Sequence, residues 1–233
     1  MSGIDSFLIR IINQVSGHSP VFDHFVALFV DMTSIKMVPL MAALWGVWFS
    51  GGGPKHSKHP VIVALVGAFV ALVIARLMQD FLPFRPRPLF SPDLHVVFPP
   101  SGSATAKLTH ANSLPSDHAA LAFALSCGLF FRSRLLGWLA IAWSTVFVCL
   151  PRVYVGFHYP SDIAAGAVLG LVCTWVASNL AATGSLTKLI LRAEERWPGV
   201  FYFLAFGISF EIANLFYDVR TTAEQVLLAV QGY

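Results

Sequence analysis

Charge is scarce in this sequence. Asp, Glu, Lys and Arg together make up 12% of the 233 residues, whereas 56% are hydrophobic and the mean hydropathy is +0.70. A soluble domain normally carries about twice that share of charge, so the composition excludes an ordinary soluble protein. The net charge of +3 is small and spread along the chain, and we therefore expect no nucleic-acid partner.

Cysteine is scarce as well. The three cysteines, Cys127, Cys149 and Cys173, all fall within apolar stretches, and they show no C-x-x-C spacing. This pattern favours buried free thiols over disulfides or a metal site.

The first residues lack the basic region with which a signal peptide begins. The stretch MSGIDSFLIRIINQVSG instead carries apolar residues at helical spacing. Two interpretations are open: a short amphipathic helix lying on the membrane surface, or a helix packed on the rest of the protein.

What the sequence does have is a series of charge-free apolar runs. A helix needs about 20 residues to cross the hydrocarbon core of a bilayer, and several runs reach or approach this length once a few polar residues are added at each end. The sequence therefore predicts an all-α integral membrane helix bundle with five or six transmembrane helices. The runs are 37–54, 60–75, 119–131, 135–151, 163–187 and 197–210.

We expect a single membrane domain over residues 1–233. It would consist of an N-terminal amphipathic, peripheral segment (1–35), a catalytic helix-bundle core (36–182) and a C-terminal helical extension (183–233). The polar segment Leu89–Leu114 is too long for a tight turn, and loops of that length are either functional or disordered.

Four of the expected helices place three short basic connections on one side of the membrane. By the positive-inside tendency that side is cytoplasmic. The opposite side also carries arginines, which violates the simple rule and calls for a chemical reason. We expect a multi-pass protein of the cell (inner) membrane whose active site faces the periplasm or exterior. The helices are at about 60–82, 115–131, 135–150 and 161–182, and the connections are 50–60, 131–134 and the segment after Thr187.

Polar residues concentrate in three clusters at helix ends on the expected outer side. RLMQDFLPFRPRP (76–88) ends one apolar helix, SLPSDHA (113–119) begins the next, and PRVYVGFHYPSD (151–162) joins two later ones. A transporter or a purely structural bundle, the alternative class of protein, would distribute polar residues through the membrane depth. Concentration at one edge favours a reaction site there.

Two helix starts indicate an anion site. Ser116 follows Pro115 and is a good N-cap, which would leave the amides of Asp117 and His118 unpaired by the helix. Pro160 suits the first turn of the next helix. Helix N-termini attract anions, and arginines add donors that match phosphate oxygens. We expect a phosphate site that requires no metal or other cofactor.

The two histidines of these clusters have plausible chemical tasks. Within Arg152-x5-His158-x3-Asp162, Asp162 can accept a hydrogen bond from one ring nitrogen of His158 and leave the other free to attack phosphorus. His118 could protonate the leaving oxygen as a general acid. The arginines would stabilise the negative charge of the transition state.

The three clusters resemble the signature of the type 2 phosphatidic acid phosphatase family, membrane lipid phosphatases that share a core with vanadium haloperoxidases. That signature reads Lys-x6-Arg-Pro, Pro-Ser-Gly-His and Ser-Arg-x5-His-x3-Asp, and the likeness covers roughly Val61–Leu180. The resemblance implies that His158 is the nucleophile, that Asp162 is its partner and that Arg152 binds phosphate. It also implies that His118 is the general acid.

The chain departs from that signature at three positions. Asp80 stands where the family has lysine, seven residues before Arg87, and Arg76, one helical turn earlier, is the nearest basic substitute. Asp117 replaces the glycine of the second motif, a PSDH variant that resembles bacterial undecaprenyl pyrophosphate phosphatases. Pro151 replaces the serine of the third motif and so removes one phosphate donor.

The expected phosphate-binding residues come from all three clusters. Arginines near a membrane edge can instead extend to lipid headgroups, and for Arg85 the two interpretations are about equal. Glu211, an acidic residue in the last apolar run, receives no role. The expected set is Arg152, Arg87, Ser116, Arg85, Arg76 and Asp117.

The resemblance implies a membrane enzyme that hydrolyses a lipid phosphate or diphosphate through a phosphohistidine, with that lipid and the membrane as its partners. Undecaprenyl diphosphate leads because of the PSDH variant, followed by phosphatidylglycerol phosphate, phosphatidic acid and phosphorylated lipid A. A phosphotransferase of the same fold would use the same residues and is the alternative. The extended membrane spans argue against a vanadate-dependent peroxidase, and the sequence carries no indication of oligomeric state.

Overall fold

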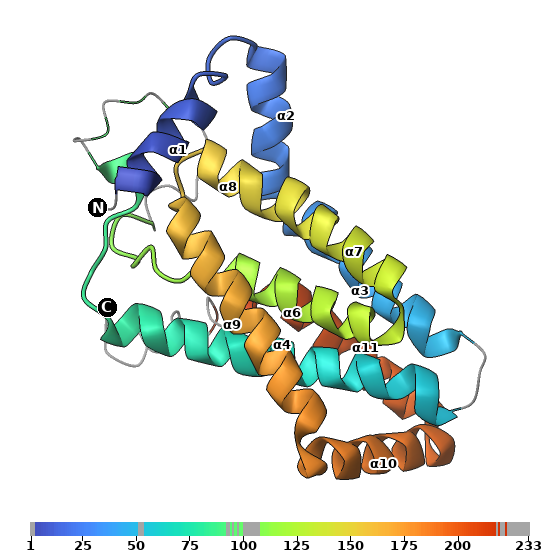
Figure 1. Cartoon of the computed structure of the whole chain (residues 1–233). Helices are drawn as coiled ribbons and strands as arrows, with labels where there is room; N and C mark the ends of the chain where they lie inside the picture. Colours follow the sequence, from blue (N-terminus) through green and yellow to red (C-terminus); the bar gives the residue numbers. More distant parts are fainter. Residues whose placement is uncertain are drawn as a thin grey trace.

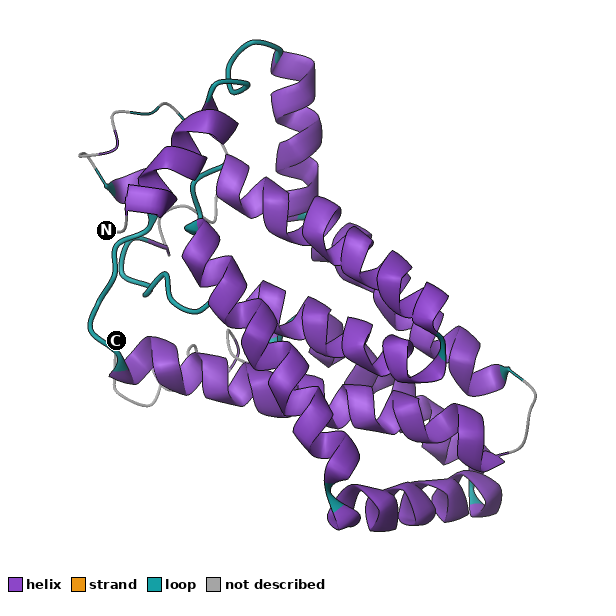
Figure 2. Ribbon diagram, in the orientation of Figure 1, coloured by secondary structure: helices purple, strands orange, loops and turns teal. Residues whose placement is uncertain are grey.

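A computed structural model describes residues 3–50, 54–91, 94, 96, 98, 99, 108–217, 219 and 222. Within this part of the chain the secondary structure is helical and contains no strand (Figure 2). The α-helices are α1 (Gly3–Asn13), α2 (Pro20–Asp31), α3 (Thr33–Phe49), α4 (Pro54–Phe81), α6 (Asp117–Arg132), α7 (Arg134–Trp143), α8 (Leu150–Tyr154), α9 (Pro160–Asn179), α10 (Ala181–Arg196) and α11 (Pro198–Ala213). The all-α prediction is thereby confirmed, and the boundaries expected after residues 35 and 182 fall in the first turns of α3 and α10.

Helix α6 is the centre of the bundle, enclosed by α3, α4, α7 and α9 (Figure 1). Its Leu121, Leu125 and Leu129 are almost completely buried. Because their spacing follows the helical repeat, they form one apolar stripe that packs into the main core. Most apolar residues of this short helix therefore face other helices, and Phe131 near its end is exposed.

Helices α6 and α9 approach each other at glycines. A Cβ atom built on Gly166 would lie 2.3 Å from the carbonyl oxygen of Ser116, and one built on Gly170 would lie 2.1 Å from that of Ala120. Small residues allow the backbones of membrane helices to come this close. The contact holds the beginning of α6 against the beginning of α9.

Among the described residues, three helical segments are long and apolar enough to cross a membrane: Lys58–Phe81, Arg134–Tyr154 and Pro160–Asn179. A fourth is possible if α2 and α3, which meet at an angle of 53°, form one broken span. These segments make the chain a multi-pass membrane protein. The expected number of five or six spans is not confirmed, because α6 and α11 have only 16 residues each.

The span Arg134–Tyr154 contains a π-helical segment, η3 (Ser144–Cys149), between α7 and α8. Pro151 follows this segment after Leu150, and proline has no backbone N–H and interrupts the regular hydrogen-bond pattern of a helix. The helix nevertheless continues past Pro151 to Tyr154, whereas the sequence had suggested a connection from that point. Arg152 consequently lies inside a helix.

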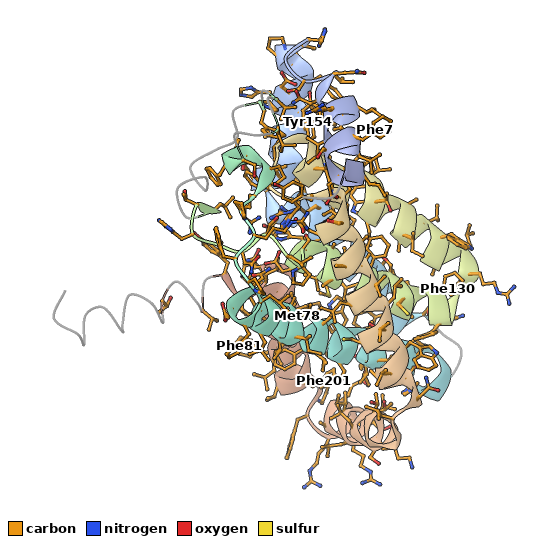
Figure 3. The ribbon with its side chains drawn as sticks, turned by 60° about the vertical axis from the view of Figure 1, so that its left-hand side comes forward. Phe7, Met78, Phe81, Phe130, Tyr154 and Phe201 are labelled. Atoms are coloured by element: carbon orange, nitrogen blue, oxygen red, sulfur yellow. The ribbon has the colours of Figure 1, made fainter. Side chains whose placement is uncertain are left out.

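Helix α1 packs on the bundle at the end where α8 stops and α9 begins (Figure 1). Its Asp5 and Ile9 are buried, while Ile4 and Phe7 are mostly exposed. Figure 3 shows Phe7 and Tyr154 of α8 at the same end of the molecule. Packing of this segment on the bundle is therefore observed, and its contact with the membrane surface stays a prediction.

Helix α10 lies across the other end of α4 and α9 (Figure 1). The Nζ atom of Lys58 in α4 donates to Glu194 of α10 at 2.5 Å, and the hydroxyl of Tyr202 in α11 donates to the same carboxylate at 2.5 Å. This polar cluster attaches the C-terminal helices to the core at the end opposite α1.

Candidate active site

All nine sequence-predicted site residues lie at one end of the bundle, where α4 and α8 end and α6 and α9 begin (Figure 1). They come from segments up to 86 positions apart in the chain, from Arg76 to Asp162. His158, Ser116 and Asp162 are completely buried. The three clusters of the sequence are therefore one cluster in space.

The ring of His158 is held by a backbone carbonyl. Its Nδ1 atom lies 2.9 Å from the carbonyl oxygen of Ser113. A carbonyl can only accept a hydrogen bond, so the proton of the neutral ring is on Nδ1. The Nε2 atom then carries the lone pair, and it lies 3.2 Å from Nη1 of Arg87.

The hydrogen bond expected between Asp162 and His158 is not formed. The Oδ2 atom of Asp162 lies 3.8 Å from Nδ1 of His158, which is too far for a hydrogen bond. Oδ2 instead accepts from the hydroxyl of Ser113 and, at 2.8 Å, from the amide of Tyr159. Asp162 thus holds Ser113, whose carbonyl holds the ring, and its own carboxylate lies within ion-pair distance of that ring.

Arg87 and Arg152 are the buried cations of the site. They are 5% and 6% exposed. Arg87 donates to the carbonyl of Phe157 at 2.8 Å, and the Arg152 guanidinium lies over the ring of the same Phe157, 5.8 Å from its centroid. The Nε atom of each arginine is buried and has no hydrogen-bond acceptor within the described structure.

Buried donors without an acceptor are rare in proteins and require an explanation. Here both belong to arginines, and one of these arginines touches the imidazole that the sequence indicates as a nucleophile. An anion with several oxygen atoms is the group that would satisfy such donors. Snorkelling to lipid headgroups does not describe either side chain, because both are buried.

Arg85 does not belong to this pair. Its Nη1 donates to Asp162 at 2.6 Å and its Nη2 to Asp5 at 2.7 Å, and its guanidinium stacks on Tyr159 at 4.1 Å. The carboxylates of Asp162 and Asp5 therefore accept the guanidinium N–H groups of Arg85 that were expected to bind phosphate. Arg85 links α1 to the beginning of α9 instead.

Ser116 is the N-cap of α6, as predicted, and its hydroxyl accepts from the amide of Ala119 at 3.5 Å. The amide of His118, however, is not free: it donates to Oδ1 of Asp117 at 2.7 Å. Pro160 lies in the first turn of α9, as expected. The start of α6 therefore offers fewer free donors than its capping pattern suggested.

Asp117 and Arg76 bind each other. The Nη2 atom of Arg76 donates to Oδ2 of Asp117, and Oδ1 of Asp117 contacts Nδ1 of His118 at 2.7 Å. Phosphate binding by Asp117 and Arg76 stays a prediction, and in the structure these two side chains are paired with each other. Asp117 faces a histidine and an arginine.

Comparison with known proteins identifies the family of the chain. The family model of the PAP2 superfamily matches residues 57–185, more than half of the chain. The chain belongs to the PAP2 superfamily. The resemblance drawn from the three motifs is confirmed, and with it the class of enzyme, a phosphatase and hence a hydrolase.

Relatives within the PAP2 superfamily have different named substrates. Undecaprenyl-diphosphatase BcrC of Bacillus subtilis is 24% identical over 71% of this chain and 78% of its own length. A lipid A 4'-phosphatase of Bacteroides thetaiotaomicron is 27% identical over 85% of this chain and 84% of its own length. The crystal structure of LpxE from Aquifex aeolicus shares the fold, with a TM-score of 0.59, 22% identity and coverage of 77% and 97% of the two chains.

Sequence reasoning missed three residues of this PAP2 site. Ser113 contributes its backbone carbonyl, which no sequence pattern reveals. Asp5 of α1 is buried and accepts from the amide and the hydroxyl of Ser161 at 3.0 and 2.8 Å, and nothing in the first seventeen residues indicated such a contact. Lys36 alone had a signal, because it is a lysine at the edge of a long apolar run.

Lys36 is almost completely buried at the bend between α2 and α3. Its Nζ atom donates to the carbonyl of Val30 at 2.5 Å, near the end of α2. It is close enough to Arg152 and Asp117 to interact with both electrostatically. A lysine is therefore present near this PAP2 site, although Asp80 stands at the family's usual lysine position.

The surroundings of His158 disfavour its protonated form. Burial, and then the charge of Arg87, lower the pKa of His158 to about 4 from an ordinary value of about 6.5. The imidazole is therefore neutral at neutral pH. This is the form in which Nε2 has a lone pair and can act as a nucleophile.

This pKa predicts how stability depends on pH. The unfolded chain takes up the His158 proton as pH falls through about 6.5, whereas the folded protein takes it up only near pH 4. The folded state therefore loses stability between these two values as pH falls. We expect the thermal unfolding midpoint in detergent to fall more between pH 7 and pH 5 for the wild type than for His158→Gln. Equal decreases of the midpoint in the two proteins would contradict the lowered pKa of His158.

Proposed function

We propose that this PAP2 protein hydrolyses a lipid phosphate or diphosphate, with His158 as nucleophile and His118 as general acid. The observation that carries the proposal is the pair of buried Nε–H groups of Arg87 and Arg152 beside a histidine of defined tautomer. The arginines would bind the phosphate oxygens. The engaged Nδ1 of His158 leaves Nε2 as the attacking atom.

In the first step Nε2 of His158 forms a bond to phosphorus and the bond to the leaving oxygen breaks. The leaving oxygen keeps the electron pair, and His118 gives it a proton. In the second step water attacks the phosphohistidine, and His118 takes up a proton from that water. Inorganic phosphate leaves and both histidines return to their starting states. The charge of Arg87 and Arg152 stabilises the equatorial oxygens in both steps.

We propose undecaprenyl diphosphate as the substrate. The PSDH motif at Asp117 and the relatives named undecaprenyl-diphosphatase support this choice. The relative named lipid A 4'-phosphatase supports a different lipid. Both substrates are lipid phosphates, so the site chemistry is common to them and a direct comparison must decide.

We further propose that the site faces the periplasm or exterior of the inner membrane. Supporting this, basic residues gather at the opposite end of the bundle, where α6 meets α7 and where α10 lies (Figure 1). They include Lys58, Arg132, Arg134 and Arg196. By the positive-inside tendency that end is cytoplasmic.

The test is phosphate release from four lipids by the purified protein in detergent. We expect undecaprenyl diphosphate to give a kcat/KM at least ~10-fold above those of phosphatidylglycerol phosphate, phosphatidic acid and phosphorylated lipid A, a difference of about 1.4 kcal/mol in transition-state binding. A higher value for any other lipid would reassign the substrate. Transfer of labelled phosphate to an added lipid acceptor, in place of release to water, would show a phosphotransferase.

A further inference from the structure

The two histidines of the site differ in what holds their Nδ1 atoms. Nδ1 of His158 faces a neutral carbonyl, that of Ser113. Nδ1 of His118 faces the carboxylate of Asp117 at 2.7 Å. A carboxylate favours the protonated imidazole and a carbonyl does not. The two rings therefore differ in the charge state that the partner of Nδ1 favours.

The Asp117 carboxylate is fixed from both sides. Its Oδ1 atom accepts from the backbone amide of His118 at 2.7 Å as well as contacting the ring, and its Oδ2 atom accepts from Arg76. Nη1 of Arg76 donates to Gln79 at 3.1 Å, and Gln79 donates to the carbonyl of Pro115 at 2.8 Å. The network joins the last turns of α4 to the beginning of α6.

We propose that Asp117 is the positioning residue of the general acid, and that Arg76 and Gln79 hold it in place. This inference rests on the proposed function. Because Nδ1 of His118 is engaged by Asp117, Nε2 is the atom that delivers the proton to the leaving oxygen. Burial and nearby Arg152 lower the pKa of His118, and the carboxylate of Asp117 is the group that opposes them and favours a proton on the ring. Arg76 neutralises the carboxylate toward the incoming phosphate.

The arrangement predicts that the contribution of Asp117 to the rate depends on the leaving group. An alcohol leaves as a strongly basic oxyanion unless it is protonated, whereas the lipid monophosphate that leaves from a lipid diphosphate is a stable anion. General acid catalysis contributes about 10²- to 10⁴-fold where the leaving group needs the proton. Asp117 therefore matters most for monoesters of poorly acidic alcohols and least for good leaving groups.

A series of aryl phosphates with leaving groups of different acidity tests this inference. For Asp117→Asn, which keeps an acceptor for Nδ1 but removes the charge, we expect kcat/KM to fall on the order of 100-fold with phenyl phosphate and less than about 5-fold with 4-nitrophenyl phosphate. Asp117→Gly restores the family's usual residue and removes both the charge and the acceptor. For this variant, kcat/KM should depend on the acidity of the leaving group at least as steeply as for Asp117→Asn. Asp80→Asn, an exposed carboxylate at the same end of α4, is the matched control and should change neither value.

Three outcomes separate this inference from the proposed function. An equal loss of activity across the series would show that Asp117 has only a structural role, and no loss would show that it does not act on His118; either overturns the inference. If His118→Ala and His158→Ala keep wild-type activity, the proposed function itself fails. If Asp117→Asn does not fold, Arg76→Lys in the same series must show the stronger loss with phenyl phosphate, or the inference is overturned.

Discussion

Replacing His158 by alanine is expected to lower kcat for phosphate release on the order of 10⁴-fold or more, which is the scale of loss when an enzyme loses its nucleophile. The Ser113 carbonyl accepts from Nδ1 of His158, so Nε2 is the ring nitrogen available for attack. Nε2 lies 3.2 Å from Nη1 of Arg87. Without it, water would have to attack the lipid phosphate directly. The measurement is release of inorganic phosphate by the purified variant in detergent.

The control for this experiment is His59→Ala. His59 lies near the opposite end of α4, where its Nδ1 contacts the hydroxyl of Thr187 at 2.9 Å, and its loss should leave kcat unchanged. Brief exposure of the wild type to labelled substrate should also leave acid-labile phosphate on the protein, and His158→Ala should carry none. Wild-type turnover by a folded His158→Ala variant would refute the phosphohistidine mechanism.

Replacing Gly166 by alanine is expected to have a large effect although this glycine carries no polar group of the site. In an ordinary helix, glycine to alanine gains about 0.5–1 kcal/mol of stability. At Gly166 the new methyl group would lie 2.3 Å from the carbonyl oxygen of Ser116. Backbone cannot move aside as a flexible side chain does, and overpacking of this kind costs about 1–3 kcal/mol. We therefore expect Gly166→Ala to destabilise the folded protein, whereas the same substitution in an ordinary helix stabilises it.

The same substitution should also lower activity. Ser116 caps the helix that begins with Asp117 and His118, so any retreat of Ser116 moves the general acid relative to His158. A displacement of about 1 Å can cost on the order of 100-fold in rate. We expect Gly166→Ala to lower both the unfolding temperature in detergent and kcat/KM. Gly184→Ala, in α10 with no atom within 4 Å of its built Cβ, should lower neither.

Much of this protein could be predicted from its sequence. Long apolar runs identify the membrane helices, because a bilayer core allows few other structures. The spacing Arg152-x5-His158-x3-Asp162 pointed to the PAP2 superfamily, because this spacing of an arginine, a histidine and an aspartate is specific to the family signature. The number of spans was not settled in this way, because a short apolar helix buried among others, such as α6, has the same composition as one facing lipid.

The partners of the charged residues could not be predicted. Asp162 was expected to contact His158 directly, but it holds Ser113, and Asp117 was expected to bind phosphate, but it binds Arg76 and His118. A carboxylate binds whichever donor lies within about 3 Å, and that donor comes from another helix. Spacing along one segment does not carry this information.

The sequence by itself determined the class of the protein and its all-helical membrane character, and it predicted the two histidines of the site, because hydrophobicity and motif spacing are local properties of the chain. Only the tertiary structure decided that a backbone carbonyl holds one histidine and a carboxylate the other, and that Asp5 and Lys36 lie close to the site. These choices depend on distances of a few tenths of an ångström between segments far apart in the chain. The packing of α4, α6, α8 and α9 at close approach sets those distances.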